Sequence, residues 1–143
     1  MEDLERYLDD VVDPTISDFE QNPTSVRHAF LACVATYHGV DYLAHPRKGV
    51  GIRQRFRTES RDFALVDDVA HAFKHVVVGE RSKPRLTARE VISRPPAHWG
   101  VAVWDLSRWD DEVGGVTLDR DRDVDLLDVV RRATVFLRGQ IKR

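Results

Sequence analysis

The chain has 143 residues, which is the usual length of one domain. Its composition, with 42% hydrophobic and 32% charged residues, supplies enough apolar material for a core and excludes a disordered chain. The 22 basic and 24 acidic residues give a net charge of −2, which disfavours a globally basic nucleic-acid-binding protein but allows a local basic patch. The single cysteine, Cys33, excludes an intrachain disulfide and a cysteine-based zinc site. The longest apolar run is far shorter than the roughly 20 residues of a membrane helix, and the first residues are acidic, unlike a signal peptide. We therefore expect a soluble, cytoplasmic protein with no membrane contact.

Acidic and basic residues are segregated along the chain. Residues 1–24 hold eight acids and one base, residues 45–61 hold six bases and one acid, and residues 104–128 hold nine acids and three bases. The last 15 residues hold five bases and no acid. Because the total is close to neutral, we interpret these blocks as acidic and basic faces that complement each other within one fold.

The first half of the chain has helical hydrophobic spacing. Residues 2–19 predict a helix that either kinks at Pro14 or restarts there with Asp13 as its N-cap. A second helix is predicted over residues 23–44, and its core stripe places Cys33 as a small buried hydrophobic residue rather than a nucleophile. A third helical region covers residues 52–78, with a break near Ser60 and Gly79 as its C-terminal glycine.

The pattern changes after residue 79. Residues 99–104 and 116–118 have strand composition and flank Gly114 and Gly115, which predicts a hairpin with a long loop. Residues 85–92 fit a third strand or a short helix, and we favour the strand. A last helix is predicted over residues 124–141, with acids at its start and bases at its end. The fold class is therefore mainly α: one domain over residues 1–143, a bundle of about four helices with a small antiparallel β insertion at about 85–118.

Three segments carry a resemblance. They read Ser-Val-Arg-His-Ala-Phe at 25–30, Tyr-His-Gly-Val-Asp at 37–41 and Asp-Val-Ala-His-Ala-Phe-Lys-His at 68–75. They resemble a group of uncharacterised bacterial helical proteins, over about residues 22–78, and that group is loosely similar to HEPN-type helical domains. The resemblance implies a helical bundle and an association with RNA cleavage or with defence and toxin–antitoxin systems. The HEPN ribonuclease motif, an Arg five residues before a His, is absent, since no Arg stands five residues before His75.

Histidines and aspartates recur on two predicted helices. His38, Asp41 and His45 share one face of the second helix, and Asp68, His71 and His75 have the same spacing on the third. Imidazole and carboxylate groups from facing helices suit a divalent transition metal. The predicted metal ligands are His38, Asp41, Asp68, His71 and His75, and the candidate catalytic residues are His38, Asp41, Lys74 and His75. A solvated face, or a hydrogen-bonded structural set, explains the same residues without a metal.

Two further features suggest binding. The basic segment contains Arg53, Arg55, Arg57 and Arg61, which could contact nucleic-acid phosphates or, alternatively, dock on the acidic N-terminal segment. Trp99 and Trp104 would point to opposite faces of a strand; an exposed tryptophan would mark an interface, but we favour packing of both on the helices.

These features favour a HEPN-like binding or regulatory domain that acts on a protein or nucleic-acid partner. The alternative is a metal-dependent hydrolase or a ribonuclease that uses the His/Asp cluster between the second and third helices. Whether the protein is an enzyme stays open, since no catalytic motif is present. We also expect a homodimer through the polar face of the third helix, loosened between about pH 7 and 5.5 by protonation of His71 and His75.

Overall fold

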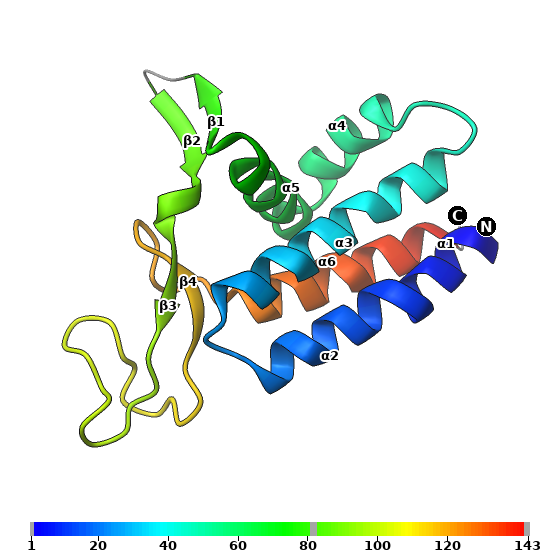
Figure 1. Ribbon diagram of the computed structural model, residues 1–143. Coiled ribbons are helices and arrows are strands. Elements are labelled where there is room, and N and C mark those ends of the chain that lie inside the picture. Colours follow the sequence, from blue (N-terminus) through cyan, green and yellow to red (C-terminus); the bar gives the residue numbers. More distant parts are fainter. Residues whose placement is uncertain (1, 81–82, 142–143) are drawn as a thin grey trace.

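The protein is a mainly α-helical bundle with a small β region before its last helix, as the sequence predicts (Figure 1). The structure is a computed structural model that describes residues 2–80 and 83–141. Its helices are α1 (Glu2–Tyr7), a π-helical turn (Leu8–Val12), α2 (Asp13–Gln21), α3 (Val26–Ala44), α4 (Val50–Glu59), α5 (Arg61–His75) and α6 (Leu126–Ile141). Its strands are β1 (Val77–Glu80), β2 (Lys83–Thr87), β3 (Val91–Arg94) and β4 (Gly115–Leu118), with a 3-10 turn (Ala88–Glu90) before β3.

The first helical segment runs without interruption from residue 2 to residue 21. The prediction of Asp13 as an N-cap is wrong, because Asp13 has helical backbone angles. A proline has no N–H and its ring crowds the preceding turn. Here the π-helical turn precedes Pro14 and widens the helix at that point, so the chain continues as α2. The resulting rod buries one apolar stripe against the bundle: Leu4, Leu8, Val12, Ile16 and Phe19.

Serine side chains cap the N-termini of α3 and α5. Ser25 Oγ accepts a hydrogen bond from the His28 N–H at the start of α3, and Ser60 Oγ accepts one from Phe63 at the start of α5. The predicted break at Ser60 is therefore confirmed, and so is the complete burial of Cys33 in α3. Gly79 does not end α5: the helix stops at His75, Val76 takes a left-handed φ of 68°, and Gly79 lies in β1.

Salt bridges connect the basic last helix to acids of other helices. Arg131 pairs with Glu20, Arg132 with Asp62, and Arg138 with both Asp9 and Asp13. The pairs with Glu20, Asp9 and Asp13 confirm that the acidic block at 1–24 and the basic block at the end of the chain complement each other. The remaining basic residues of the predicted C-terminal block, 142 and 143, lie outside the described residues.

The β region differs in detail from the predicted hairpin. It consists of two separate antiparallel pairs, β1 with β2 and β3 with β4. Residues 85–92 contain both a strand and a short helix, the two alternatives that the sequence allows. Strand β2 ends at Thr87, and the 3-10 turn that follows is capped by a capping box between Thr87 and Glu90. Residues 99–104 form no strand, because β4 pairs with β3 and leaves that segment in the connecting loop. The predicted packing of Trp99 and Trp104 on the helices is also wrong, since both side chains are exposed.

Among the helices in residues 2–80 and 83–141, none combines the length and the apolar character that crossing a bilayer requires.

Candidate functional site

A cavity of about 390 Å³ opens between α4, α5 and the first β pair. We call it the arginine cleft, after the three guanidinium groups on its wall. It is lined by Val50, Arg53, Gln54, Arg57, Asp67, His71, Val78 and Arg85. The lining comes from four elements that meet only in the folded chain: α4 supplies four residues, α5 supplies two, and β1 and β2 supply one each.

On the α3 side, Arg53 is held by two groups of that helix. Its Nη2 donates to Asp41 Oδ1 at 3.0 Å, and its Nη1 donates to the Tyr37 hydroxyl. The guanidinium carbon lies 4.9 Å from the centre of the Tyr37 ring, within cation–π distance. His38 and Asp41 pair with each other, with His38 Nδ1 2.9 Å from Asp41 Oδ2. Asp41 therefore bridges His38 and Arg53 and orients the arginine at the cleft.

On the α5 side, Arg57 lies between two adjacent carboxylates. Its Nη1 is 2.6 Å from Asp67 Oδ2 and 2.9 Å from Asp68 Oδ1, and Arg85 Nη2 reaches the same Asp68 oxygen at 3.2 Å. Burial alone would lower the pKa of Arg57, but hydrogen bonds to Asp68 and Asp67 outweigh it and raise the pKa. Arg57 is therefore a permanent cation in this wall, and Asp67 is buried beneath it.

His71 is oriented by the turn of helix that precedes it. Its Nδ1 lies 2.9 Å from the Asp67 carbonyl oxygen, to which it donates, and 2.7 Å from Asp67 Oδ1. The Tyr37 ring meets the His71 ring edge-on, with centroids 5.0 Å apart. Burial raises the pKa of Tyr37, and the charge of Arg53 lowers it by less, so the phenol stays protonated at neutral pH. In the described chain Nε2 of His71 makes no hydrogen bond, so this nitrogen is free to meet a ligand.

Unpaired polar atoms concentrate at this site. Four buried side-chain nitrogen or oxygen atoms of the described residues lack a hydrogen-bond partner, and three of them belong here: Arg53 Nε, Asp67 Oδ1 and Asp68 Oδ1. The two carboxylate oxygens lie near cations or N–H groups without an aligned hydrogen bond. Buried polar groups are normally hydrogen-bonded, so such atoms need an explanation. Arg53 Nε is therefore an unpaired donor inside the wall, whereas Asp67 Oδ1 and Asp68 Oδ1 are held by the nearby charges of His71, Arg57 and Arg85.

The structure separates the predicted metal ligands into smaller groups. His38 contacts Asp41, and the His71 and His75 rings stack with centroids 6.1 Å apart. Asp68 faces Arg57 and Arg85 instead of a histidine. Within residues 2–80 and 83–141, no three His, Cys, Asp or Glu side chains gather as they would around a metal ion. Lys74 and His75 lie exposed at the end of α5, outside the cleft lining.

The predicted basic patch is also divided. Arg53 and Arg57 line the cleft, whereas Arg55 pairs with Glu59 at 3.4 Å and Arg61 lines a different surface depression. The carboxylate partners of Arg53 and Arg57 are Asp41, Asp67 and Asp68, not the acidic N-terminal segment. In a helix, residues two apart point in different directions, which is why alternate arginines do not form one row.

Four polar residues of the site were not predicted as ligands or catalytic groups: Tyr37, Gln54, Asp67 and Arg85. The i,i+4 spacing of Asp67 and His71 is the one local signal that could have found the pair. Tyr37 belongs to the core stripe of α3, and Arg85 reaches the cleft only because β2 folds back along α5. No local pattern connects Arg85 to Arg57.

Comparison with known proteins identifies no relative of this chain. No protein-family model, no curated protein and no solved structure matches this chain.

Proposed function

We propose that the arginine cleft binds a nucleotide unit of single-stranded RNA. The phosphate would lie against the guanidinium groups of Arg53, Arg57 and Arg85, and the sugar or base would donate hydrogen bonds to Asp67 and Asp68. The observation that carries the proposal is the convergence of three guanidinium groups and His71 on the lining of one cleft. Guanidinium groups donate hydrogen bonds to phosphate oxygens, whereas imidazole and carboxylate groups accept them from hydroxyl and amino groups, and a nucleotide has both kinds of group.

The charges of the cleft favour a ligand that is anionic in only one part. Three arginines face it, but Asp41, Asp67 and Asp68 offset them, so a bare polyanion gains little. A nucleotide separates its phosphate from its hydroxyl and amino groups by several ångströms, which suits a wall that alternates guanidinium and carboxylate. The HEPN-like resemblance covers α3, α4 and α5, the three helices of the site, and supports RNA as the ligand and a binding or regulatory role.

RNA cleavage is the second candidate, and the orientation of His71 favours it. With Nδ1 turned to Asp67, the free Nε2 can accept a proton from a ribose 2′-hydroxyl. The resulting oxygen would attack the adjacent phosphorus and form a 2′,3′-cyclic phosphate, while the arginines stabilise the added negative charge. The bond to the 5′-oxygen breaks, and this oxygen takes a proton from water and leaves as a 5′-hydroxyl. Of the predicted His/Asp cluster between α3 and α5, this reaction uses His71 alone, with Asp67 as its partner. A bound divalent metal is the other form of the same proposal.

RNA binding can be measured by fluorescence anisotropy with a labelled single-stranded oligonucleotide. One neutralised phosphate implies a log–log salt slope of about −0.7 for single strands. We expect Arg53→Gln and Arg85→Gln each to weaken binding and to reduce this slope, whereas Arg89→Gln, an exposed position outside the cleft, leaves both unchanged. Binding that is absent at low salt, or equal in all four proteins, contradicts the proposal. Thermal unfolding of each variant excludes loss of the fold as the cause.

Cleavage is tested on the same oligonucleotide by separating the products. We expect His71→Asn to abolish cleavage and to leave binding within a few-fold, while His75→Asn retains activity. Cleavage that persists in a chelator supports the metal-independent form, and cleavage restored by added Mn²⁺ supports the metal-dependent one. If the oligonucleotide stays intact under all conditions, the ribonuclease proposal is wrong and RNA binding stays the proposed function.

A homodimer is a separate proposal. The predicted interface on α5 is reduced, because α4 and β2 cover Asp67 and Asp68 within the chain. Lys74 and His75 stay exposed and are the part of that face that could meet a second copy. Sedimentation between pH 7 and 5.5 tests this. A monomer at every pH would contradict the homodimer. A dimer whose dissociation does not depend on pH would show that the interface does not include the histidines of α5.

A further inference from the structure

The connection between β3 and β4 presents an unusual concentration of exposed apolar side chains. In residues 95–114, here called the aromatic loop, Trp99, Trp104 and Trp109 are 104%, 86% and 92% exposed. Val101, Val103 and Val113 are exposed as well, so this loop holds six of the twelve large hydrophobic residues exposed in the described chain. Figure 1 shows the loop extending beyond β3 and β4, away from the helices. Exposed apolar surface of this density marks interaction sites in folded proteins.

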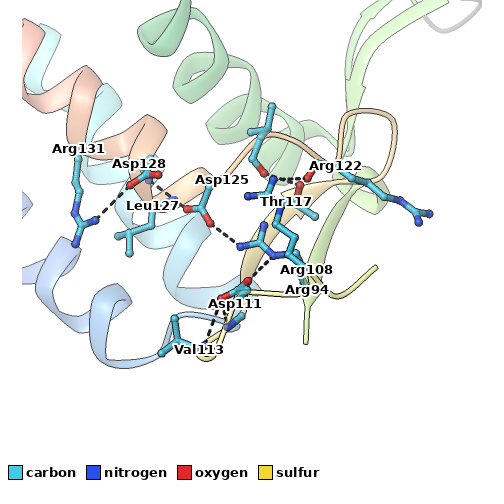
Figure 2. Close-up of polar contacts among 12 residues, drawn as sticks. Arg94, Arg108, Asp111, Val113, Thr117, Arg122, Asp125, Leu127, Asp128 and Arg131 are labelled. Carbon is cyan, nitrogen blue, oxygen red and sulfur yellow. Dashed lines mark hydrogen bonds and ion pairs between the residues drawn. The ribbon is translucent and has the colours of Figure 1, made fainter. Parts of the chain in front are cut away.

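A buried ion-pair network fixes the base of the aromatic loop (Figure 2). Arg94, at the end of β3, is 3% exposed. Its Nε donates to Asp111 Oδ2 and its Nη2 to Asp125 Oδ2, each at 2.9 Å. Asp111 in turn accepts from the Gly114 N–H at 2.8 Å, and its carbonyl accepts from the Ala97 N–H at 2.7 Å. Both ends of the loop are therefore tied to one point.

The loop also has internal structure. The Val101 and Ala102 N–H groups donate to the His98 carbonyl, at 3.0 and 2.9 Å. The Ser107 N–H donates to the Val103 carbonyl, and Ser107 Oγ accepts from the Val103 N–H. A surface held in place before binding loses less conformational entropy when a partner arrives. The three indoles are thus presented by an ordered loop.

The charge of the aromatic loop selects the kind of partner. It contains four acids and one base. Asp105, Asp110 and Glu112 are exposed, and in the described part of the chain none of them forms an ion pair. An RNA strand or an anionic membrane would be repelled by these carboxylates. A cationic partner is attracted both by these carboxylates and by the faces of the indole rings, which bind Arg and Lys side chains through cation–π contacts.

We propose that the aromatic loop docks a basic segment of a partner protein, with Arg or Lys side chains between the indoles and the carboxylates. Three indoles at about 200 Å² each would supply most of the roughly 800 Å² that one partner buries in a standard interface. The loop contributes no residue to the lining of the arginine cleft, so this site is independent of the proposed RNA site.

Tryptophan fluorescence reports on this site alone, because the three tryptophans of the chain all lie in the aromatic loop. The probe is a capped decapeptide that alternates arginine and leucine, and the control peptide alternates glutamate and leucine. We expect the basic peptide to shift the emission maximum to shorter wavelength with saturation, and the acidic peptide to cause no shift. Equal shifts with both peptides, or none with the basic one, overturn the proposal.

Two sets of variants separate the aromatic and electrostatic contributions, with a fluorescein-labelled basic peptide followed by anisotropy. We expect Trp99→Ala/Trp104→Ala/Trp109→Ala and Asp105→Asn/Asp110→Asn/Glu112→Gln each to weaken binding by about tenfold or more. The control Asp3→Asn/Glu5→Gln/Asp18→Asn removes the same charge from exposed positions of the first helical rod and should bind like the parent. Circular dichroism checks the fold of each variant.

Other occupants of the loop give different results in the same assays. Emission shifts induced by uridine oligonucleotides or by anionic vesicles, but not by the basic peptide, would assign the surface to RNA or lipid and overturn the proposal. A shift that depends on protein concentration without peptide, together with a dimer in sedimentation, would assign it to a second copy of this chain and overturn it equally.

Discussion

Arg94 and Asp125 form an ion pair that spans 31 positions of the sequence, with Nη2 of the arginine 2.9 Å from Oδ2 of the aspartate. Asp125 has a second role, because its Oδ1 accepts from the Leu127 and Asp128 N–H groups at the start of α6. One carboxylate thus caps the last helix and holds the end of β3 against it. Asp111 completes the network from within the aromatic loop.

Loss of the Arg94 guanidinium should strongly destabilise the fold. The substitution Arg94→Met leaves Asp111 and Asp125 charged and poorly solvated, which costs about 3–5 kcal/mol when one partner of a buried pair is removed. Urea denaturation measures the change. The control Arg6→Met breaks an exposed pair with Asp10 and should cost less than about 1 kcal/mol. Equal effects of the two substitutions would contradict a structural role for Arg94.

The same network predicts a stability loss in acid. Burial would raise the pKa of Asp111, but the hydrogen bonds from Arg94 and from the Gly114 N–H outweigh it, so the pKa lies below its ordinary value of 3.8. A carboxyl group whose pKa is lower in the folded state contributes stability above its unfolded pKa and loses it as the pH falls through the folded value. The free-energy difference between the parent and Asp111→Asn should therefore be constant above about pH 5 and shrink below about pH 4. A difference that is independent of pH contradicts this assignment.

Glycine substitutions at two positions should have opposite effects. Gly114 has φ +73°, and a Cβ there would lie 2.5 Å from the Arg94 carbonyl oxygen, so Gly114→Ala should destabilise by about 1–3 kcal/mol. Gly139 lies inside α6 with nothing within 4 Å of an added Cβ. Gly139→Ala should therefore stabilise the protein by about 0.5–1 kcal/mol. Thermal unfolding compares the two, and the same sign for both would contradict the backbone geometry.

Cys33 should be chemically silent in the native protein. Burial raises the pKa of its thiol to about 12, and the side chain is fully enclosed in α3. Because the thiolate is the reactive form, a disulfide exchange reagent should label Cys33 only at the rate of opening or unfolding. The reaction is followed by absorbance with and without denaturant. Complete labelling within seconds under native conditions would show that the thiol is accessible.

Local sequence patterns predicted most of the helical framework. The hydrophobic spacing, the serine cap at Ser60 and the acidic start of α6 act over one or two helical turns, so they are readable without the fold. The pairing of His38 with Asp41 was predictable for the same reason, since both lie on one helix face. The burial of Cys33 follows from its place in an apolar stripe.

Tertiary structure decided the binding surfaces. The apolar composition of residues 99–104 indicated a strand, but a strand needs a partner, and β3 pairs with β4. The tryptophans therefore stay exposed. In the same way, Arg57 meets Asp67 because α4 folds onto α5, and Arg85 joins them because β2 turns back along that helix. Side-chain spacing determines which residues share a face of one element, whereas the loops and the packing of the core determine which faces meet.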